Sequence, residues 1–249
     1  MRRRAVRAVA SLVLLALASC GGQREWSDIA ASDNMKSEGP TTSRSITVGG
    51  GLAGETLPSE QWERIVADVE PITYKVFNQG CSFTATGSAV AIGPTLLVTN
   101  RHVVEGARVL EVQAPGSARL GVRSWRTSKA DDLALLELSS AIPDAPLDLG
   151  TAPVPGDLVA ALGYPLGGDL TAGQGRIVEM DKDGAEAGLL KASMEVLPGN
   201  SGGPLIDTRG TLVGVVRAID LTEGWAIAVP VERVRALLDD KNALNASPC

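Results

Sequence analysis

The sequence predicts an all-β protein made of two six-stranded antiparallel β-barrels. Three observations lead to this fold class: glycine and proline are abundant (28 and 14 residues), aromatic residues make up only 3%, and short apolar runs alternate with turn residues. Many short strands separated by turn signals are typical of barrels and sandwiches. A proline-rich stretch at 141–156 divides the runs into two groups of about six. A chain of 249 residues is long enough for one sizeable domain or two small ones that share a core.

The predicted strands follow one another from residue 72. The first group, expected as a barrel over about 72–143, reads ITYKVF, ATGSAVAI, TLLVTN, RVLEVQAP, LGVRSW and LALLELS. The second group, expected as a barrel over about 153–230, reads DLVAALGYP, LTAGQGRIVEM, LLKASMEV, GPLIDTRGTLVGVV and GWAIAV.

Two helices are predicted beside the barrels. The stretch PSEQWERIVADVEP places four apolar residues at spacings of three and four, namely Trp62, Ile65, Val66 and Val69. This spacing, with a proline near the start and another just past the end, indicates a short amphipathic helix whose apolar stripe docks on the domain. The stretch PVERVRALLDDKNAL predicts a helix over about 230–244.

The first twenty residues form a separate segment. A basic start, an apolar run from Ala8 to Ala18 and small residues after it are the pattern of a secretory signal. The apolar run is too short for a comfortable membrane span. It ends in LASC followed by GG, which resembles a bacterial lipobox. We therefore expect a signal peptide over 1–20, lipid attachment at Cys20 and an exported protein anchored to the bacterial membrane or envelope; the alternative is an ordinary signal peptide with a chance cysteine.

Residues 21–57 are rich in glycine, serine, threonine and charge. This composition predicts a flexible tether that leads to a folded domain over 58–249. If Cys20 carries lipid, Cys81 and Cys249 remain, and an even pair in an exported protein suggests a disulfide. Such a bridge would close a loop long enough to contribute roughly 5 kcal/mol in the chain-entropy treatment. The alternative is two unpaired thiols.

The charge balance restricts the partners. The net charge is −6 and there is no basic patch, which argues against nucleic acid. We expect neither a metal nor a cofactor.

Three segments carry residues suited to nucleophilic catalysis. Ser201 lies in PGNSGGPL, and the single histidine, His102, lies in TLLVTNRHVVEG directly after an apolar strand. Asp131 and Asp132 precede the apolar strand in KADDLALLELS. A serine nucleophile needs a base, and the base needs a third group to orient it. Each residue also has a structural interpretation: a small turn residue, a satisfied histidine and solvated turn carboxylates.

Together, the segments TNRHVV, DLALL and GNSGGPL, in that order, resemble the chymotrypsin-like (trypsin-like) serine peptidases over about residues 72–238. The stretches LGYPLGG and GWAIAVPVERV are similar to those of the bacterial high-temperature-requirement (Deg) branch. The placement of Cys81 and Cys249 is similar to that in the envelope acid-resistance serine proteases. The resemblance implies a peptidase site in the cleft between the two barrels.

The resemblance also implies a role for each site residue. Ser201 would attack the scissile carbonyl, and His102 would take the serine proton and later protonate the leaving amine. Asp132 would orient His102, in preference to Asp131, because the family's aspartate directly precedes the apolar strand. The backbone N–H groups of Gly199 and Ser201 would form the oxyanion hole, where donors typically contribute about 3–4 kcal/mol.

Three further residues bear on regulation and specificity. Asn200 stands where digestive members have the aspartate that pairs with a newly cut N-terminus, so we expect no activation by cleavage. Glu195 lies six residues before the serine, where an acidic side chain can favour basic substrates. Arg217, near the expected pocket wall, could neutralise it, and the alternative for Glu195 is an outward-facing strand residue.

The sequence therefore predicts a serine endopeptidase that acts on proteins of the bacterial cell envelope. Two other classes remain open: a catalytically silent barrel that binds peptides or a partner, and an esterase. Against the esterase, GNSGG does not have the glycine offsets of the GxSxG strand–turn–helix motif.

Overall fold

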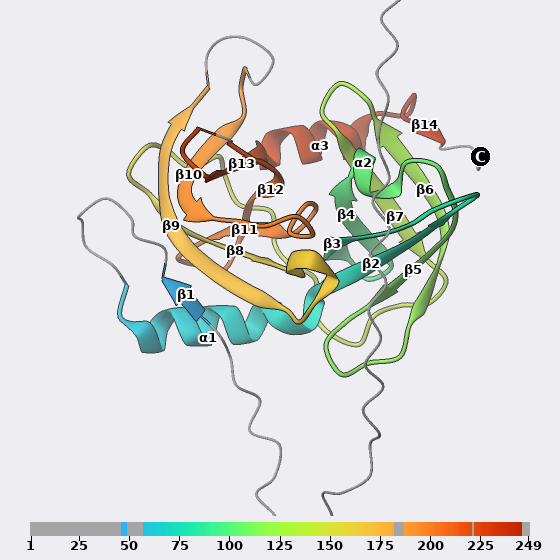
Figure 1. Cartoon of the computed structure of the whole chain (residues 1–249), viewed down its shortest axis with the longest axis horizontal. Helices are drawn as coiled ribbons and strands as arrows, with labels where there is room; N and C mark the ends of the chain where they lie inside the picture. Colours follow the sequence, from blue (N-terminus) through green and yellow to red (C-terminus); the bar gives the residue numbers. More distant parts are fainter. Residues whose placement is uncertain (1–45, 49–56, 182–186, 221, 246–249) are drawn as a thin grey trace, which may run out of the picture. The chain divides into compact units, whose positions relative to one another are not determined.

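The computed structural model describes residues 46–48, 57–181, 187–220 and 222–245. The predictions for the signal peptide, for Cys20, for Cys249 and for most of the tether lie outside the described residues. Two sheets carry the fold, and each closes on itself through six antiparallel strands, so the predicted fold class is confirmed (Figure 1).

The first barrel is built from strands in the order β6-β5-β2-β3-β4-β7 and closes through the pairing of β6 with β7. Its strands are β2 (Thr73–Gly80), β3 (Thr84–Gly93), β4 (Leu96–Asn100), β5 (Ala107–Gln113), β6 (Leu120–Ser128) and β7 (Leu133–Leu138). Alternation along β2 puts Tyr74, Val76 and Asn78 inside, as the period-2 pleat of a strand requires. A one-turn helix, α2 (Arg101–Val104), directly follows β4.

The second barrel has the order β9-β10-β13-β12-β11-β8 and closes through the pairing of β8 with β9. Its strands are β8 (Leu158–Gly163), β9 (Thr171–Met180), β10 (Leu190–Glu195), β11 (Pro204–Asp207), β12 (Leu212–Ile219) and β13 (Trp225–Pro230). A 3-10 turn, η2 (Pro165–Gly167), follows β8. Bulges interrupt the pairing of β10 and of β12 with their neighbours.

Helices α1 (Ser59–Val69) and α3 (Val231–Asp239) pack their apolar stripes on the barrels. A 3-10 turn, η1 (Glu70–Ile72), joins α1 to β2. The buried residues of these helices belong to one core cluster that includes residues of both barrels; they are Trp62, Val66 and Val69 of α1 and Val231, Val234 and Leu237 of α3. A second cluster fills the second barrel. None of the described helices is long and apolar enough to cross a membrane.

Two details differ from the sequence expectation. Part of the expected tether, Ile46–Val48, is strand β1, which pairs in parallel with β9. The last helix ends at Asp239 rather than near residue 244, and Leu244–Asn245 form β14 on β6. Asp239 and Asp240 place negative charge at the negative end of the helix dipole, which disfavours continuation of the helix. The Asp240 side chain also accepts the Asn242 N–H at 2.7 Å in a turn.

Candidate active site

His102 lies on α2, immediately after the buried end of β4. The Arg101 N–H donates to the Asp132 carbonyl oxygen at 2.9 Å, and the Asn100 side-chain amide donates to the same oxygen at 3.2 Å. These contacts hold the turn before β7 against α2. The histidine and the aspartate therefore come together because β4 ends, and its neighbour β7 begins, at the same edge of the first barrel.

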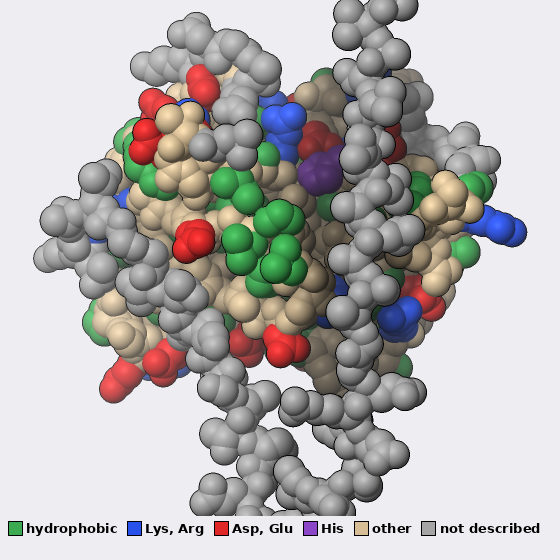
Figure 2. Space-filling view, in the orientation of Figure 1, with side chains coloured by type: hydrophobic (Ala, Val, Ile, Leu, Met, Phe, Trp, Pro, Cys, Tyr) green, Lys and Arg blue, Asp and Glu red, His purple; other side chains and the backbone are tan. Residues whose placement is uncertain are grey.

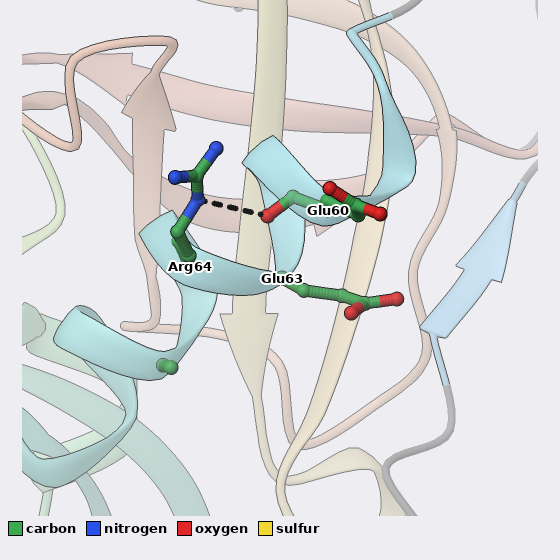
Figure 3. Close-up of a pocket in the computed structure, with 4 residues that line it drawn as sticks. Glu60, Glu63 and Arg64 are labelled. Carbon is green, nitrogen blue, oxygen red and sulfur yellow. Dashed lines mark hydrogen bonds between the residues drawn. The ribbon is translucent and has the colours of Figure 1, made fainter.

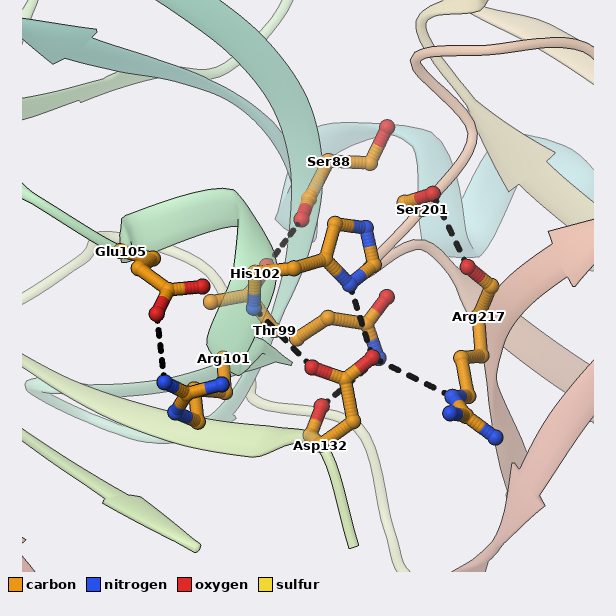
Figure 4. A network of polar contacts seen from close by, with 9 residues as sticks. Ser88, Thr99, Arg101, His102, Glu105, Asp132, Ser201 and Arg217 are labelled. Carbon is orange, nitrogen blue, oxygen red and sulfur yellow. Dashed lines mark hydrogen bonds and ion pairs between the residues drawn. The ribbon is translucent and has the colours of Figure 1, made fainter. Parts of the chain in front are cut away.

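Asp132 uses both carboxylate oxygens on His102. Oδ1 accepts the His102 backbone N–H at 3.0 Å, and Oδ2 lies 2.7 Å from the ring nitrogen Nδ1 (Figure 4). Asp132 has a φ of 55°, in the left-handed region that aspartate tolerates better than most residues. Burial raises the pKa of the carboxyl, but the hydrogen bonds and charge of His102, together with the Arg217 charge, outweigh it, so this pKa lies below the ordinary 3.8.

Asp131 points elsewhere. Its Oδ2 accepts the Ser128 hydroxyl at 2.8 Å, and its Oδ1 lies 3.4 Å from the Arg233 guanidinium of α3. Of the two adjacent carboxylates, the structure brings Asp132, and not Asp131, to the histidine.

Ser201 lies in the turn between β10 and β11, in the second barrel. The turn approaches β3 of the first barrel so closely that a Cβ on Gly202 would lie 2.0 Å from the Ser88 carbonyl oxygen, and Gly202 has a φ of +87°. The Ser201 carbonyl oxygen accepts the Ser88 N–H at 2.8 Å. The Ser201 hydroxyl donates to the Arg217 carbonyl oxygen at 3.1 Å rather than to His102 (Figure 4).

The Gly199 peptide is held by the turn after β8. The Pro198 carbonyl oxygen accepts the Leu166 N–H at 2.5 Å. Because C=O and N–H point to opposite sides of a trans peptide, this bond directs the Gly199 N–H away from that turn. Within the described part of the chain, neither this N–H nor that of Ser201 has a hydrogen-bond acceptor. Both donors are thus available beside the Ser201 hydroxyl.

An apolar cavity of about 320 Å³ opens next to Ser201. Its lining contains no titratable side chain; it consists of Val196, Leu197, Pro198, Ser201, Val216, Ala218 and Ile219. Figure 2 shows the face that carries the histidine, with apolar side chains gathered to one side of it. A cavity of this lining accepts an aliphatic side chain better than a charged one.

The structure does not bring Glu195 to this cavity. Glu195 is exposed at the end of β10 and lines a separate hollow of about 160 Å³, which it shares with Asn200. A further hollow, of about 360 Å³, lies on α1 and is lined by Glu60, Glu63, Arg64 and Ala67 (Figure 3). Among the described residues, no three His, Cys, Asp or Glu side chains gather as metal ligands.

Arg217 occupies a position that sequence reasoning did not find. The guanidinium Nε lies 3.3 Å from Asp132 Oδ2, whereas the sequence placed this residue near the pocket wall, where it could neutralise Glu195. No local motif marks it. The available sequence signal is the separation of sixteen residues between Ser201 and Arg217, which lets strand β12 run back past the serine turn.

The chain is similar in sequence to known peptidases over much of its length. The family profile of the trypsin-like peptidase domain matches residues 87–215, just over half of the chain. The putative serine protease HhoA of Synechocystis sp. is 32% identical over 181 residues, which cover 68% of this chain and 44% of that protein. The serine protease Do-like HtrA of Bacillus subtilis is 30% identical over 163 residues, 59% of this chain and 36% of that protein.

The solved structures show the same fold. The Rv3671c protease from M. tuberculosis in its active form has a TM-score of 0.67 at 25% identity, and the match covers 88% of this chain and 97% of that one. The serine endoprotease from Yersinia pestis has a TM-score of 0.66 at 24% identity and covers 74% and 67%. This chain spans 44%, 20% and 39% of the length of the first three curated relatives.

Proposed function

Because the chain belongs to the trypsin-like peptidase domain family, we propose that it is a serine endopeptidase that uses Ser201, His102 and Asp132. The observation that carries the proposal is the 2.7 Å contact between His102 Nδ1 and Asp132 Oδ2 at the edge of the barrel that faces the Ser201 turn. The N–H groups of Gly199 and Ser201, which have no acceptor among the described residues, supply the hydrogen bonds that the developing oxyanion requires.

The mechanism begins with a rotation of the Ser201 hydroxyl from the Arg217 carbonyl oxygen toward His102 Nε2. His102 takes the hydroxyl proton while Oγ attacks the substrate carbonyl carbon, and Asp132 holds the Nδ1–H and stabilises the imidazolium. The Gly199 and Ser201 N–H groups bind the oxyanion. The imidazolium then gives its proton to the leaving amine, and an acyl-enzyme remains. A water molecule, deprotonated by His102, hydrolyses the acyl-enzyme and restores Ser201.

The apolar cavity supports a preference for an aliphatic side chain just before the scissile bond. Val216, Ala218 and Ile219 line it, and its volume suits a residue such as valine or leucine. The expectation of a basic preference rested on Glu195, whose side chain lines the separate hollow. We therefore assign no role in this cavity to Glu195.

The location is proposed from the sequence. A lipobox-like LASC at Cys20 and the segment after it support export and anchoring to the bacterial membrane, with protein substrates in the cell envelope. Metabolic labelling with a radioactive fatty acid tests this, because the Cys20→Ala protein should lose the label and leave the membrane fraction. Equal labelling of both proteins would refute the anchor.

A catalytically silent, peptide-binding barrel is the second candidate. One observation favours it: the Ser201 hydroxyl contacts the Arg217 carbonyl oxygen instead of the imidazole. Catalytic hydrogen bonds, however, are often long or unformed before substrate binds, so this contact is compatible with catalysis.

Cleavage of an unfolded protein such as casein, alongside a small ester, separates the candidates. The endopeptidase predicts new peptide ends in casein with the wild type and none with Ser201→Ala or His102→Ala. Thr95→Ala, which removes a hydroxyl that bonds Glu137 elsewhere in the first barrel, is the matched control and should cleave normally. Hydrolysis of the ester alone would favour an esterase, and binding without any hydrolysis would favour the silent barrel.

A further inference from the structure

Arg217 and His102 share one oxygen atom. Asp132 Oδ2 lies 2.7 Å from His102 Nδ1 and 3.3 Å from Arg217 Nε (Figure 4). Arg217 comes from β12 in the second barrel, whereas the other two residues come from the first. A permanent positive charge from one barrel therefore contacts the histidine–aspartate pair of the other.

The charge has opposite effects on the two partners. A guanidinium stays protonated at every relevant pH, so it attracts the Asp132 carboxylate and repels a protonated imidazole on the same oxygen. Protonation of His102 before substrate attack removes the general base. A nearby cation that disfavours this protonation keeps the base available at lower pH. The Arg217 side chain is 34% exposed, so solvent and salt weaken the effect without abolishing it.

Charged side chains on the elements beside the pair form ion pairs of their own. On α2, the Arg101 guanidinium bonds the Glu105 carboxylate at 2.5 Å. In the turn before β7, Asp131 pairs with Arg233 of α3. Among the described residues, Arg217 is the arginine or lysine that contacts Asp132.

We propose that Arg217 is a positioning residue that holds Asp132 Oδ2 and extends the activity of the site to lower pH by disfavouring the protonated form of His102. The inference rests on the proposed function for its consequence in catalysis. Its physical core, the effect of one charge on one histidine, is measurable without any substrate.

The single histidine of the chain makes the test direct. The protein is labelled with carbon-13 histidine, and the His102 ring signal is followed by NMR from pH 4 to pH 9. In Arg217→Gln, the midpoint of the titration should lie at higher pH than in the wild type, because the cation that repels the imidazolium is gone. In Arg217→Lys, which keeps the charge, it should lie nearer the wild type than in Arg217→Gln.

Arg233→Gln is the matched control, because it neutralises an arginine that pairs with Asp131 instead of Asp132. Its midpoint should stay close to that of the wild type. Arg217→Ser supplies a second neutral variant if the glutamine protein does not fold. In the same proteins, the rate of inactivation by a fluorophosphonate is measured against pH. The pH at which this rate falls on the acid side should shift together with the NMR midpoint.

The results separate the two claims. An unchanged midpoint in Arg217→Gln and Arg217→Ser, or an equal shift in Arg217→Lys and Arg217→Gln, would overturn the role of the charge. If the midpoint shifts in Arg217→Gln but the fluorophosphonate never modifies the wild-type protein, the electrostatic relationship is upheld and the proposed function is refuted.

Discussion

The Ser88 hydroxyl of the first barrel donates a 2.7 Å hydrogen bond to the Gly199 carbonyl oxygen of the second. The same hydroxyl accepts the Tyr164 N–H at 3.0 Å, and the Ser88 backbone N–H donates to the Ser201 carbonyl oxygen at 2.8 Å. One buried residue of β3 therefore contacts the serine turn on both sides of Asn200. Because the proposed triad is divided between the barrels, these bonds fix the serine turn relative to His102.

Ser88→Ala should impair catalysis more than substrate binding. The change removes the 2.7 Å bond and leaves the Gly199 carbonyl and Tyr164 N–H groups without a partner, which costs about 1–3 kcal/mol of stability. We expect kcat to fall about 10- to 100-fold with a smaller change in KM, since a misplaced donor loses transition-state stabilisation. An unchanged kcat in a folded Ser88→Ala protein would show that the hydroxyl does not position the turn.

Gly199→Ala should abolish most of the activity. Gly199 has a φ of +104°, and a Cβ there would lie 2.3 Å from the Tyr164 carbonyl oxygen, so the peptide that carries the N–H must move. Loss of one oxyanion donor predicts a decrease in kcat of about 10²- to 10³-fold. Gly116→Ala is the control, because Gly116 also has a positive φ, +67°, but a Cβ there meets nothing within 4 Å. Similar losses in both variants would point to general destabilisation.

Asp132 should make the folded state sensitive to acid. Its pKa is lower in the folded protein than the ordinary 3.8, so its stabilising contribution is complete above the unfolded value and is lost as the pH falls through the folded value. The difference in free energy of unfolding between wild type and Asp132→Asn should therefore be larger at pH 6 than near pH 3. Urea unfolding at the two pH values measures it, and a difference that grows toward acid would have the opposite sign to the account.

The apolar cavity predicts which bonds are cut. In a peptide library, the wild type should cleave after valine, leucine or isoleucine better than after lysine. Ala218→Leu fills the cavity and should shift the preference toward alanine. Glu195→Gln is the contrasting variant and should leave the preference unchanged, since Glu195 lines the other hollow. A gain of cleavage after neutral residues at the expense of lysine in Glu195→Gln would restore the earlier expectation.

Removal of residues 1–44 should leave the rate of fluorophosphonate labelling unchanged. Asn200 is uncharged, and its buried Oδ1 has no hydrogen-bond partner among the described residues, so position 200 supplies no carboxylate to pair with a new N-terminus. The cut also leaves β1, which begins at Ile46, intact. A large increase in labelling would indicate activation by cleavage.

The fold could be predicted because its signals are local. Apolar runs bounded by glycine and proline mark each strand, and Trp62, Val66 and Val69 mark one face of α1. The pairing of His102 with Asp132, rather than Asp131, came from the resemblance to the serine peptidases, whose aspartate directly precedes an apolar strand. Short elements escaped prediction, since β1 and β14 have three and two residues and depend on pairing with β9 and β6.

The side-chain directions in the site could not be predicted. Arg217 was placed near a pocket wall, but the guanidinium reaches Asp132 because β12 passes the turn of the opposite barrel, a relationship that no periodicity encodes. The position of Glu195 was left open between two alternatives for a similar reason. Its distance from Ser201 along the chain says nothing about the side of the Val196–Leu197 segment on which its carboxylate lies.

The central claim is that Ser201 is a nucleophile activated by His102. The most direct measurement is the mass of the protein after reaction with a fluorophosphonate, followed by peptide mapping of the adduct. We predict a single adduct on the peptide that contains Ser201, with no adduct in Ser201→Ala and labelling slowed by at least about 10³-fold in His102→Ala. An adduct on another residue, or equal labelling of Ser201→Ala, would contradict the account.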